Sequence, residues 1–189
     1  MGKIAQINIK PKRKIPILGY GISYKKLSAL ESARRKKYGR YYLSTFPTEG
    51  VSGYKLQFSK RHTYQPGAFG IVLADSRSQE LANLALGFSR GTLKIYEIQG
   101  LEFKDKLVLF SKNAKTTWAN YLVGTAIEHA RRMKLGYVKL LRPEANPAVL
   151  WKLLSPERRN AIRALYYGIA KRFGFKKIKG KKFLIKKLE

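Results

Sequence analysis

The sequence predicts an α/β (α+β) fold in which a mixed, mostly antiparallel sheet is flanked by helices. Apolar and polar residues alternate in residues 54–58 and 93–98, which is the period of half-buried strands, and short apolar runs lie between them at 69–74 and 81–88. Apolar residues instead recur at helical spacing in residues 116–134, and a helix start signal opens residues 155–173. The length of 189 residues fits a single domain, expected over residues 23–189, after a basic N-terminal arm at 1–22.

The first half of the chain predicts one helix and then an antiparallel meander. Ser23 precedes a segment with helical spacing, Tyr24 to Tyr38, whose last turn gathers cations that suit the helix dipole. Strands are expected over residues 54–58, 69–74, 81–88 and 93–98, with turns at 75–78 and 89–91.

The second half predicts a crossover followed by a helix and a last strand. The apolar run Leu107–Phe110 is typical of a buried strand, and a helix should run from Thr116 to Lys134 before Gly136 ends it. A further strand, Tyr137–Leu141, would then pair in parallel with the run at 107–110. The remaining elements are a helical turn or two at 148–154, a helix from Ser155-Pro156 to Phe173 stopped by Gly174, and a strand at 182–188.

The charge is extreme and uneven, with 40 Lys and Arg against 11 Asp and Glu, a formal net charge of +29. Residues 1–40 hold 12 basic residues and one acid, whereas residues 41–110 hold eight and six. Such a charge disfavours compaction unless a polyanion binds, and 44% hydrophobic residues exclude a merely disordered basic tail. The expected partner is nucleic acid, with DNA favoured over RNA.

Clusters of cations define the expected nucleic-acid surface. One interleaves Arg and Lys with tyrosines before and after Gly39, which suits phosphate neutralisation combined with stacking. Three further clusters lie at the end of the helix expected at 116–134, at the start of the helix expected at 155–173, and before the strand expected at 182–188. The residues expected to bind nucleic acid are Arg34, Arg35, Lys36, Lys37, Arg40, Arg131, Arg132, Arg158, Arg159, Lys176 and Lys177.

Several function classes are excluded by composition. The chain has no cysteine and two histidines, and its carboxylates are scattered singly, so neither a thiol nucleophile nor a metal site is expected. The P-loop, HExxH and GxSxG motifs are absent. No apolar run reaches membrane-spanning length and the start of the chain lacks a signal-peptide apolar region, so we expect a cytoplasmic protein associated with nucleic acid and not with a membrane.

The order of these elements resembles the GNAT superfamily of N-acyltransferases over roughly Tyr54 to Leu188. The local pieces that carry the resemblance are Lys106 to Met133 and the helix ending Ala170-Lys171-Arg172-Phe173-Gly174-Phe175. It implies an acetyl-CoA or other acyl-CoA cofactor whose pyrophosphate lies on the loop before the central helix. By this resemblance the cofactor residues are Lys112, Asn113, Lys115 and Thr116. The loop lacks the family's glycines, so the phosphate could equally belong to a nucleic-acid backbone, and a turn with Thr capping the helix is the alternative interpretation.

The family also uses a tyrosine of its last helix as an acid. Tyr166 and Tyr167 lie on that helix but seven or eight residues before Gly174, whereas the family spacing is nearer four, so packing is the favoured interpretation.

A narrower resemblance is to phage DNA-modification proteins of the Mom type, divergent GNAT relatives that act on adenine in DNA. It rests on Arg61-His62-Thr63-Tyr64-Gln65-Pro66-Gly67 leading into a strand, and on the segment 112–132. It implies His62 for proton transfer and Tyr64 for stacking on a base, against the simpler interpretation of a solvated loop. His129, two turns after Leu122, is expected to pack at the apolar face.

Two functions therefore remain open. One is a nucleic-acid-binding, GNAT-like acyltransferase that modifies a DNA base. The other is a non-catalytic DNA- or RNA-binding protein on a degenerate acyltransferase scaffold.

Overall fold

The computed structural model describes residues 51–59, 69–89, 91–101, 103–146 and 151–188. Several predictions fall outside these ranges: the arm at 1–22, the helix Tyr24 to Tyr38 with four nucleic-acid residues, the fifth such residue Arg40, and the two catalytic candidates His62 and Tyr64.

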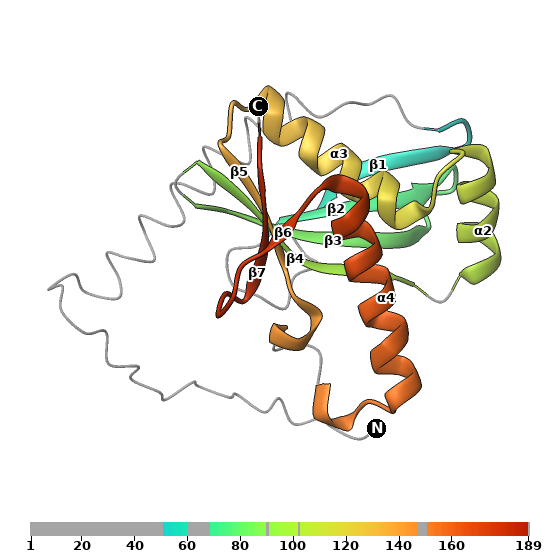
Figure 1. Ribbon diagram of the computed structural model, residues 1–189. Helices are drawn as coiled ribbons and strands as arrows, with labels where there is room; N and C mark the ends of the chain where they lie inside the picture. Colours follow the sequence, from blue (N-terminus) through green and yellow to red (C-terminus); the bar gives the residue numbers. More distant parts are fainter. Residues whose placement is uncertain (1–50, 60–68, 90, 102, 147–150, 189) are drawn as a thin grey trace, which may run out of the picture.

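A seven-stranded sheet forms the centre of the described molecule (Figure 1). Its order is β1-β2-β3-β4-β5-β7-β6, and every neighbouring pair is antiparallel except β4 and β5. The predicted mixed, mostly antiparallel sheet is therefore confirmed. The strands are β1 (Tyr54–Ser59), β2 (Phe69–Asp75), β3 (Glu80–Ser89), β4 (Thr92–Gly100), β5 (Tyr137–Leu141), β6 (Lys176–Lys177) and β7 (Phe183–Lys187).

The four strands predicted for the meander are present as β1 to β4; β4 alternates in part between buried and less buried residues, whereas β3 is buried almost throughout. The turn between β2 and β3 is held by Asp75, whose carboxylate Oδ1 accepts hydrogen bonds from the backbone amides of Arg77 and Gln79 at 3.0 and 2.9 Å. The last turn of the meander contains Gly91 at φ 71°, a left-handed conformation that glycine adopts without a Cβ penalty.

The predicted strand at Leu107–Phe110 is wrong, because these residues belong to helix α2 (Lys104–Asn113). A run of four apolar residues does not distinguish a strand from a helix, and charged residues extend this one on both sides into a ten-residue helix. Leu107 and Phe110 are buried, whereas Val108 and Leu109 are 55% and 54% exposed, which is helical spacing of the core contacts. The strand that pairs in parallel with β5 is consequently β4.

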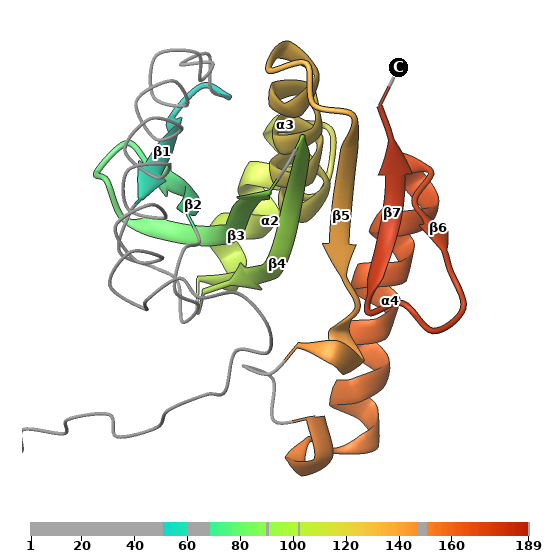
Figure 2. The ribbon, with the colours of Figure 1, turned by 90° about the vertical axis from the view of Figure 1, so that its left-hand side faces the viewer.

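Two longer helices pack on the same face of the sheet as α2 (Figure 2). Helix α3 (Trp118–Arg132) begins at the N-cap Thr117, and helix α4 (Pro156–Phe173) begins at the N-cap Ser155 and ends at Gly174, which is left-handed at φ 71°. Buried side chains of α3 and α4 form one core with the sheet residues Leu93, Ile95, Val138, Leu140 and Leu184.

Short 3-10 turns connect β5 to α4. They are η1 (Pro143–Ala145) and η2 (Trp151–Leu153), the second of which lies within the turn predicted at 148–154. Of the described helices, none is long and apolar enough to cross a membrane.

Candidate functional site

An open hollow of about 700 Å³ lies between α2 and the beginning of α3. Its lining combines apolar side chains with three lysines and three hydroxyls: Lys104, Leu107, Val108, Ser111, Lys112, Lys115, Thr116, Thr117 and Trp118. Three of the four predicted cofactor residues, Lys112, Lys115 and Thr116, thus lie at one site. Asn113, the fourth, is exposed at the end of α2 and does not line the hollow.

The floor of the hollow is built on a glycine at the end of β4. A Cβ at Gly100 would lie 3.0 Å from the indole ring of Trp118 and 3.3 Å from Leu107. The missing side chain therefore lets both apolar residues approach the strand, and it fixes α2 and α3 against the same point of the sheet.

The connection between α2 and α3 is a tight turn rather than a glycine-rich phosphate loop. Lys115 is left-handed at φ 52°, a conformation that costs a side-chain-bearing residue roughly 1 kcal/mol. The cofactor prediction placed this loop after a strand at 107–110, whereas the turn follows helix α2.

Two of the first three amides of α3 are already hydrogen-bonded within the protein. Trp118 N donates to Ser111 Oγ at 3.1 Å, and Asn120 N donates to Thr117 Oγ1 at 3.2 Å. Ser111 in turn donates to the Leu107 carbonyl at 2.7 Å. Binding a pyrophosphate on these two amides would break contacts that the chain makes itself, whereas the lysine side chains of the lining can meet a phosphate without that loss.

A second potential cofactor position is where β4 and β5 separate. Their pairing ends at Ile95 and Leu140, while β4 continues to Gly100. Beyond that point Asn146 Nδ2 donates to the Tyr96 carbonyl at 3.3 Å, and Ile98 N donates to the Tyr166 hydroxyl at 3.0 Å. The described chain therefore fills polar positions that an extended, amide-bearing ligand would need if it paired with β4.

The two tyrosines of α4 have structural partners. Burial raises the pKa of Tyr166 to about 12, and its hydroxyl accepts from the β4 backbone, so it is a poor proton donor at neutral pH. Tyr167 donates to Glu144 at 3.2 Å. Both observations agree with packing rather than catalysis.

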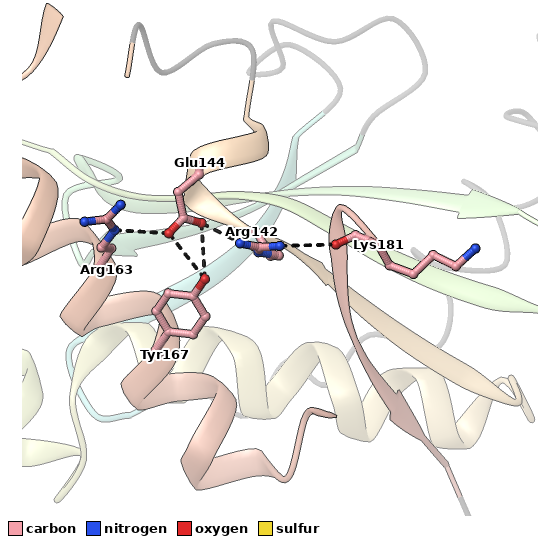
Figure 3. A network of polar contacts seen from close by, with 5 residues as sticks. All are labelled: Arg142, Glu144, Arg163, Tyr167 and Lys181. Atoms are coloured by element: carbon pink, nitrogen blue, oxygen red, sulfur yellow. Dashed lines mark hydrogen bonds and ion pairs between the residues drawn. The ribbon is translucent and has the colours of Figure 1, made fainter. Parts of the chain in front are cut away.

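Glu144 is the centre of a polar network at the end of β5 (Figure 3). Arg163 Nε donates to the Glu144 carboxylate at 3.1 Å, and Arg142 Nε lies 3.7 Å from the same carboxylate. Arg142 also donates a hydrogen bond to the Lys181 carbonyl at 3.4 Å. Burial raises the pKa of Glu144, but hydrogen bonds from its own amide, Arg163 and Tyr167, and the charge of Arg142, outweigh burial and lower it. The network ties η1 to α4 and to the loop before β7.

The predicted nucleic-acid residues that the structure describes lie at separate places. Arg131 and Arg132 end α3 and form ion pairs with Glu128 at 3.8 and 3.4 Å. Arg158 and Arg159 start α4, and Arg159 Nε donates to the Leu154 carbonyl at 3.0 Å. Lys176 and Lys177 form β6, beyond the other end of α4, which at 1.5 Å per residue is about 27 Å long. These six residues therefore do not form one patch.

His129 is 1% exposed on α3, as its position after Leu122 predicted. Burial, followed by the charge of Arg132, lowers its pKa to about 4, so the imidazole is neutral at pH 7. Among the described residues, no group of three or more His, Asp or Glu side chains could hold a metal ion.

Sequence reasoning missed Lys104 and Trp118 as parts of the hollow. By its spacing Trp118 belongs to the apolar face of the helix expected at 116–134, and Lys104 precedes the segment expected to be a strand. The sequence signal for this site is the closeness of Trp118 to Lys112 and Lys115 along the chain.

Comparisons with known proteins return acetyltransferases of the GNAT family among solved structures. One is a GNAT acetyltransferase from Staphylococcus aureus Mu50, with 8% identity, 65% of this chain and 69% of that chain covered, and a TM-score of 0.40. A second is YhbS from Escherichia coli, solved in complex with CoA, with 13% identity, coverage of 86% and 67%, and a TM-score of 0.37. A third is Tetrahymena GCN5, with 8% identity, coverage of 91% and 92%, and a TM-score of 0.35.

No protein-family model matches the chain, and no curated protein matches it either. At TM-scores below 0.5 the three structural likenesses decide neither the family nor the activity.

Proposed function

We propose that the protein binds nucleic acid on a GNAT-like, acyltransferase-type scaffold, and that the hollow between α2 and α3 receives a nucleotide of the bound polymer. The observation that supports this best is the hollow itself. Lys104, Lys112 and Lys115 surround an apolar floor with Trp118, so one site offers cations for a phosphate and an aromatic ring for a base.

The net charge of +29 supports a polymer rather than a single nucleotide. A free nucleotide or a coenzyme carries a few negative charges. A nucleic acid carries one negative charge at every nucleotide, so it can neutralise cations that are spread over several elements of the protein. The separation of the predicted cations over α3, α4 and β6 agrees with a long ligand.

The second candidate is acyl transfer from acetyl-CoA or another acyl-CoA, with a DNA base as acceptor in the manner of the Mom-type proteins. It is favoured by one observation, the gathering of Lys112, Lys115 and Thr116 at one site, as the GNAT resemblance implies. In this candidate His62 and Tyr64 act on the base. The α3 amides bonded to Ser111 and Thr117, and the β4 groups bonded to Asn146 and Tyr166, count against it.

Salt-dependent binding tests the first candidate. The full chain is titrated into a fluorescein-labelled 20-nucleotide single strand and a 20-base-pair duplex at 50, 100 and 200 mM salt, with fluorescence anisotropy as the readout. We expect affinity for at least one of them to fall steeply with salt, because each neutralised phosphate contributes a logarithmic slope of about 0.7 to 0.9. Absence of binding to both, or affinity that does not change with salt, would refute nucleic-acid binding.

The variant Lys112→Gln/Lys115→Asn tests the hollow, since asparagine tolerates the left-handed backbone at residue 115. The variant Arg77→Gln/Lys171→Gln removes the same charge elsewhere and serves as the matched control. The hollow variant should lower the salt slope by about 1.4 to 1.8, well beyond the control. Equal slopes for both variants would place nucleic acid outside the hollow.

Acetyl-CoA separates the two candidates. A rise in melting temperature with acetyl-CoA that is lost in the hollow variant and kept in the control, together with modified nucleosides in DNA incubated with protein and acetyl-CoA, would establish the enzyme. Binding of nucleic acid without either effect would favour the non-catalytic protein.

A further inference from the structure

The half of the sheet formed by β4, β5, β7 and β6 has a row of lysines on the face opposite α3 and α4. Neighbouring residues across strands share a face, and the register pairs Lys94 with Lys139, Lys139 with Ile185, and Ile185 with Lys176. A second row pairs Thr92 with Tyr137 and Tyr137 with Lys187. We call the surface that carries Lys94, Lys139, Lys176 and Lys187 the lysine face.

Alternation along the strands shows that this is not the helix-packed side. Leu93 and Ile95 on β4, and Val138 and Leu140 on β5, belong to the core shared with α3 and α4, so Lys94 and Lys139 point the other way. No described helix covers the lysine face. Tyr137 is 43% exposed and Lys176 and Lys187 are exposed, while Lys94 and Lys139 are half-buried.

The pairing of Lys94 with Lys139 is unfavourable without an anion. Directly opposed side chains in a sheet lie about 5 Å apart, and like charges at such positions destabilise the sheet. The next lysine in the row, Lys176, lies two strand spacings beyond Lys139, or about 10 Å. Between Thr92 and Ile95, where β4 pairs with β5, and along β5, β7 and β6, this face carries no carboxylate. Farther along β4, Glu97 pairs with Ala85, which shares a face with the partner of Lys94, Gly87, so one carboxylate lies on the same side of the sheet beyond the bulge in β4.

Aromatic rings lie among these lysines. Phe183, opposite Leu141 on the same face, has its ring centroid 6.2 Å from that of Tyr96, and Lys94 Nζ lies 6.0 Å from the Phe183 centroid. The Tyr96 ring lies over Gly87, where a Cβ would be 2.7 Å from it. Tyr137 adds a partly exposed ring on the adjoining row.

From this arrangement we infer that the lysine face binds single-stranded nucleic acid, with the lysines on its phosphates and Tyr137 stacked on a base. This inference rests on the proposed function. It adds that the bound nucleic acid is single-stranded and that it contacts a surface separate from the hollow. An exposed ring on a sheet reaches the face of an unpaired base, whereas the base faces of a duplex are covered by their neighbours. Cations spaced along rows of the sheet suit the backbone of an extended strand.

The variant Lys94→Gln/Lys139→Gln tests the phosphate contacts, again beside the control Arg77→Gln/Lys171→Gln. The probes are fluorescein-labelled oligo(dT) and oligo(rU) of 20 nucleotides and a 20-base-pair duplex. Each lost contact with a single strand should cost about five-fold at 100 mM salt, so the double variant should bind oligo(dT) about 25-fold more weakly and lower the salt slope by about 1.4. The control should stay close to the wild type.

The variant Tyr137→Thr tests stacking while keeping a residue that favours strands. It should weaken binding to the single strands by about five-fold or more at unchanged salt slope, and leave duplex binding as it is. Circular dichroism of each variant shows whether the sheet is intact.

The outcomes separate this inference from the proposed function. If the wild type binds none of the three probes, the proposed function fails. If it binds but the lysine-face variants behave like the control, or if it prefers the duplex, nucleic-acid binding stands and the lysine face is refuted as a single-strand site.

Discussion

The buried histidine of α3 predicts how the stability of the protein depends on pH. His129 is neutral in the folded protein down to a pKa of about 4, whereas in the unfolded chain it takes up a proton near its ordinary value of 6.5. The unfolded state therefore binds more protons as the pH falls below about 6.5, and the free energy of unfolding must decrease. Between pH 7.5 and pH 5 these two pKa values correspond to a loss of about 2 kcal/mol.

The assay compares the wild type with His129→Gln, which keeps a polar side chain that does not titrate. Urea unfolding is followed at both pH values by far-UV circular dichroism. The carboxylates with lowered pKa values, such as Asp75 and Glu144, contribute equally to the pH dependence of stability in the wild type and in the variant. The difference between the two proteins therefore isolates the contribution of His129. The wild type should lose about 2 kcal/mol more than the variant. An equal loss in both proteins, or an imidazole pKa above 6 by NMR titration of the folded wild type, would refute the reasoning.

Three further changes have defined outcomes. Tyr166→Phe removes the acceptor of the buried Ile98 amide and should lower the free energy of unfolding by about 1–3 kcal/mol in urea titrations; an unchanged midpoint would contradict this role. Thr117→Ala should cost about 1 kcal/mol by losing the cap on Asn120, whereas Thr117→Ser should cost far less, and equal losses would exclude capping as the cause. Glu144→Gln should destabilise the protein most at pH 7 and progressively less as the pH falls through the lowered pKa of the carboxyl, since a carboxylate with a lowered pKa stabilises above its ordinary pKa and loses that effect on protonation; a difference constant with pH would count against the ion-pair network.

The regular parts of the fold could be predicted because their signals are local. The alternating segments 54–58 and 93–98 became β1 and β4, the apolar runs 69–74 and 81–88 became β2 and β3, and Ser155-Pro156 and Gly174 mark the two ends of α4 as expected. Local signals were insufficient at Leu107–Phe110, where burial of only two of the four residues reveals a helix. That distinction depends on how the segment packs against α3 and the sheet, which the sequence pattern does not contain.

The candidate site was predictable in part for the same reason. A helix start with lysines near Thr117 was visible, so Lys112 and Lys115 could be named. The floor made by Trp118 over Gly100 joins residues from two elements, and the pairing of Lys94 with Lys139 depends on strand register across a crossover. Neither juxtaposition follows from spacing along the chain, which is why the basic clusters were predicted from runs of Lys and Arg and the lysine face was not.

The edge strand β6 also bears on the solubility of the protein. It is two residues long and both are lysine, so it offers another chain little backbone to pair with and repels a second copy that carries the same charge. A bound polyanion would remove that repulsion while leaving the backbone of the edge accessible. Self-association should therefore be strongest near charge equivalence with nucleic acid and should decrease again when either component is in excess.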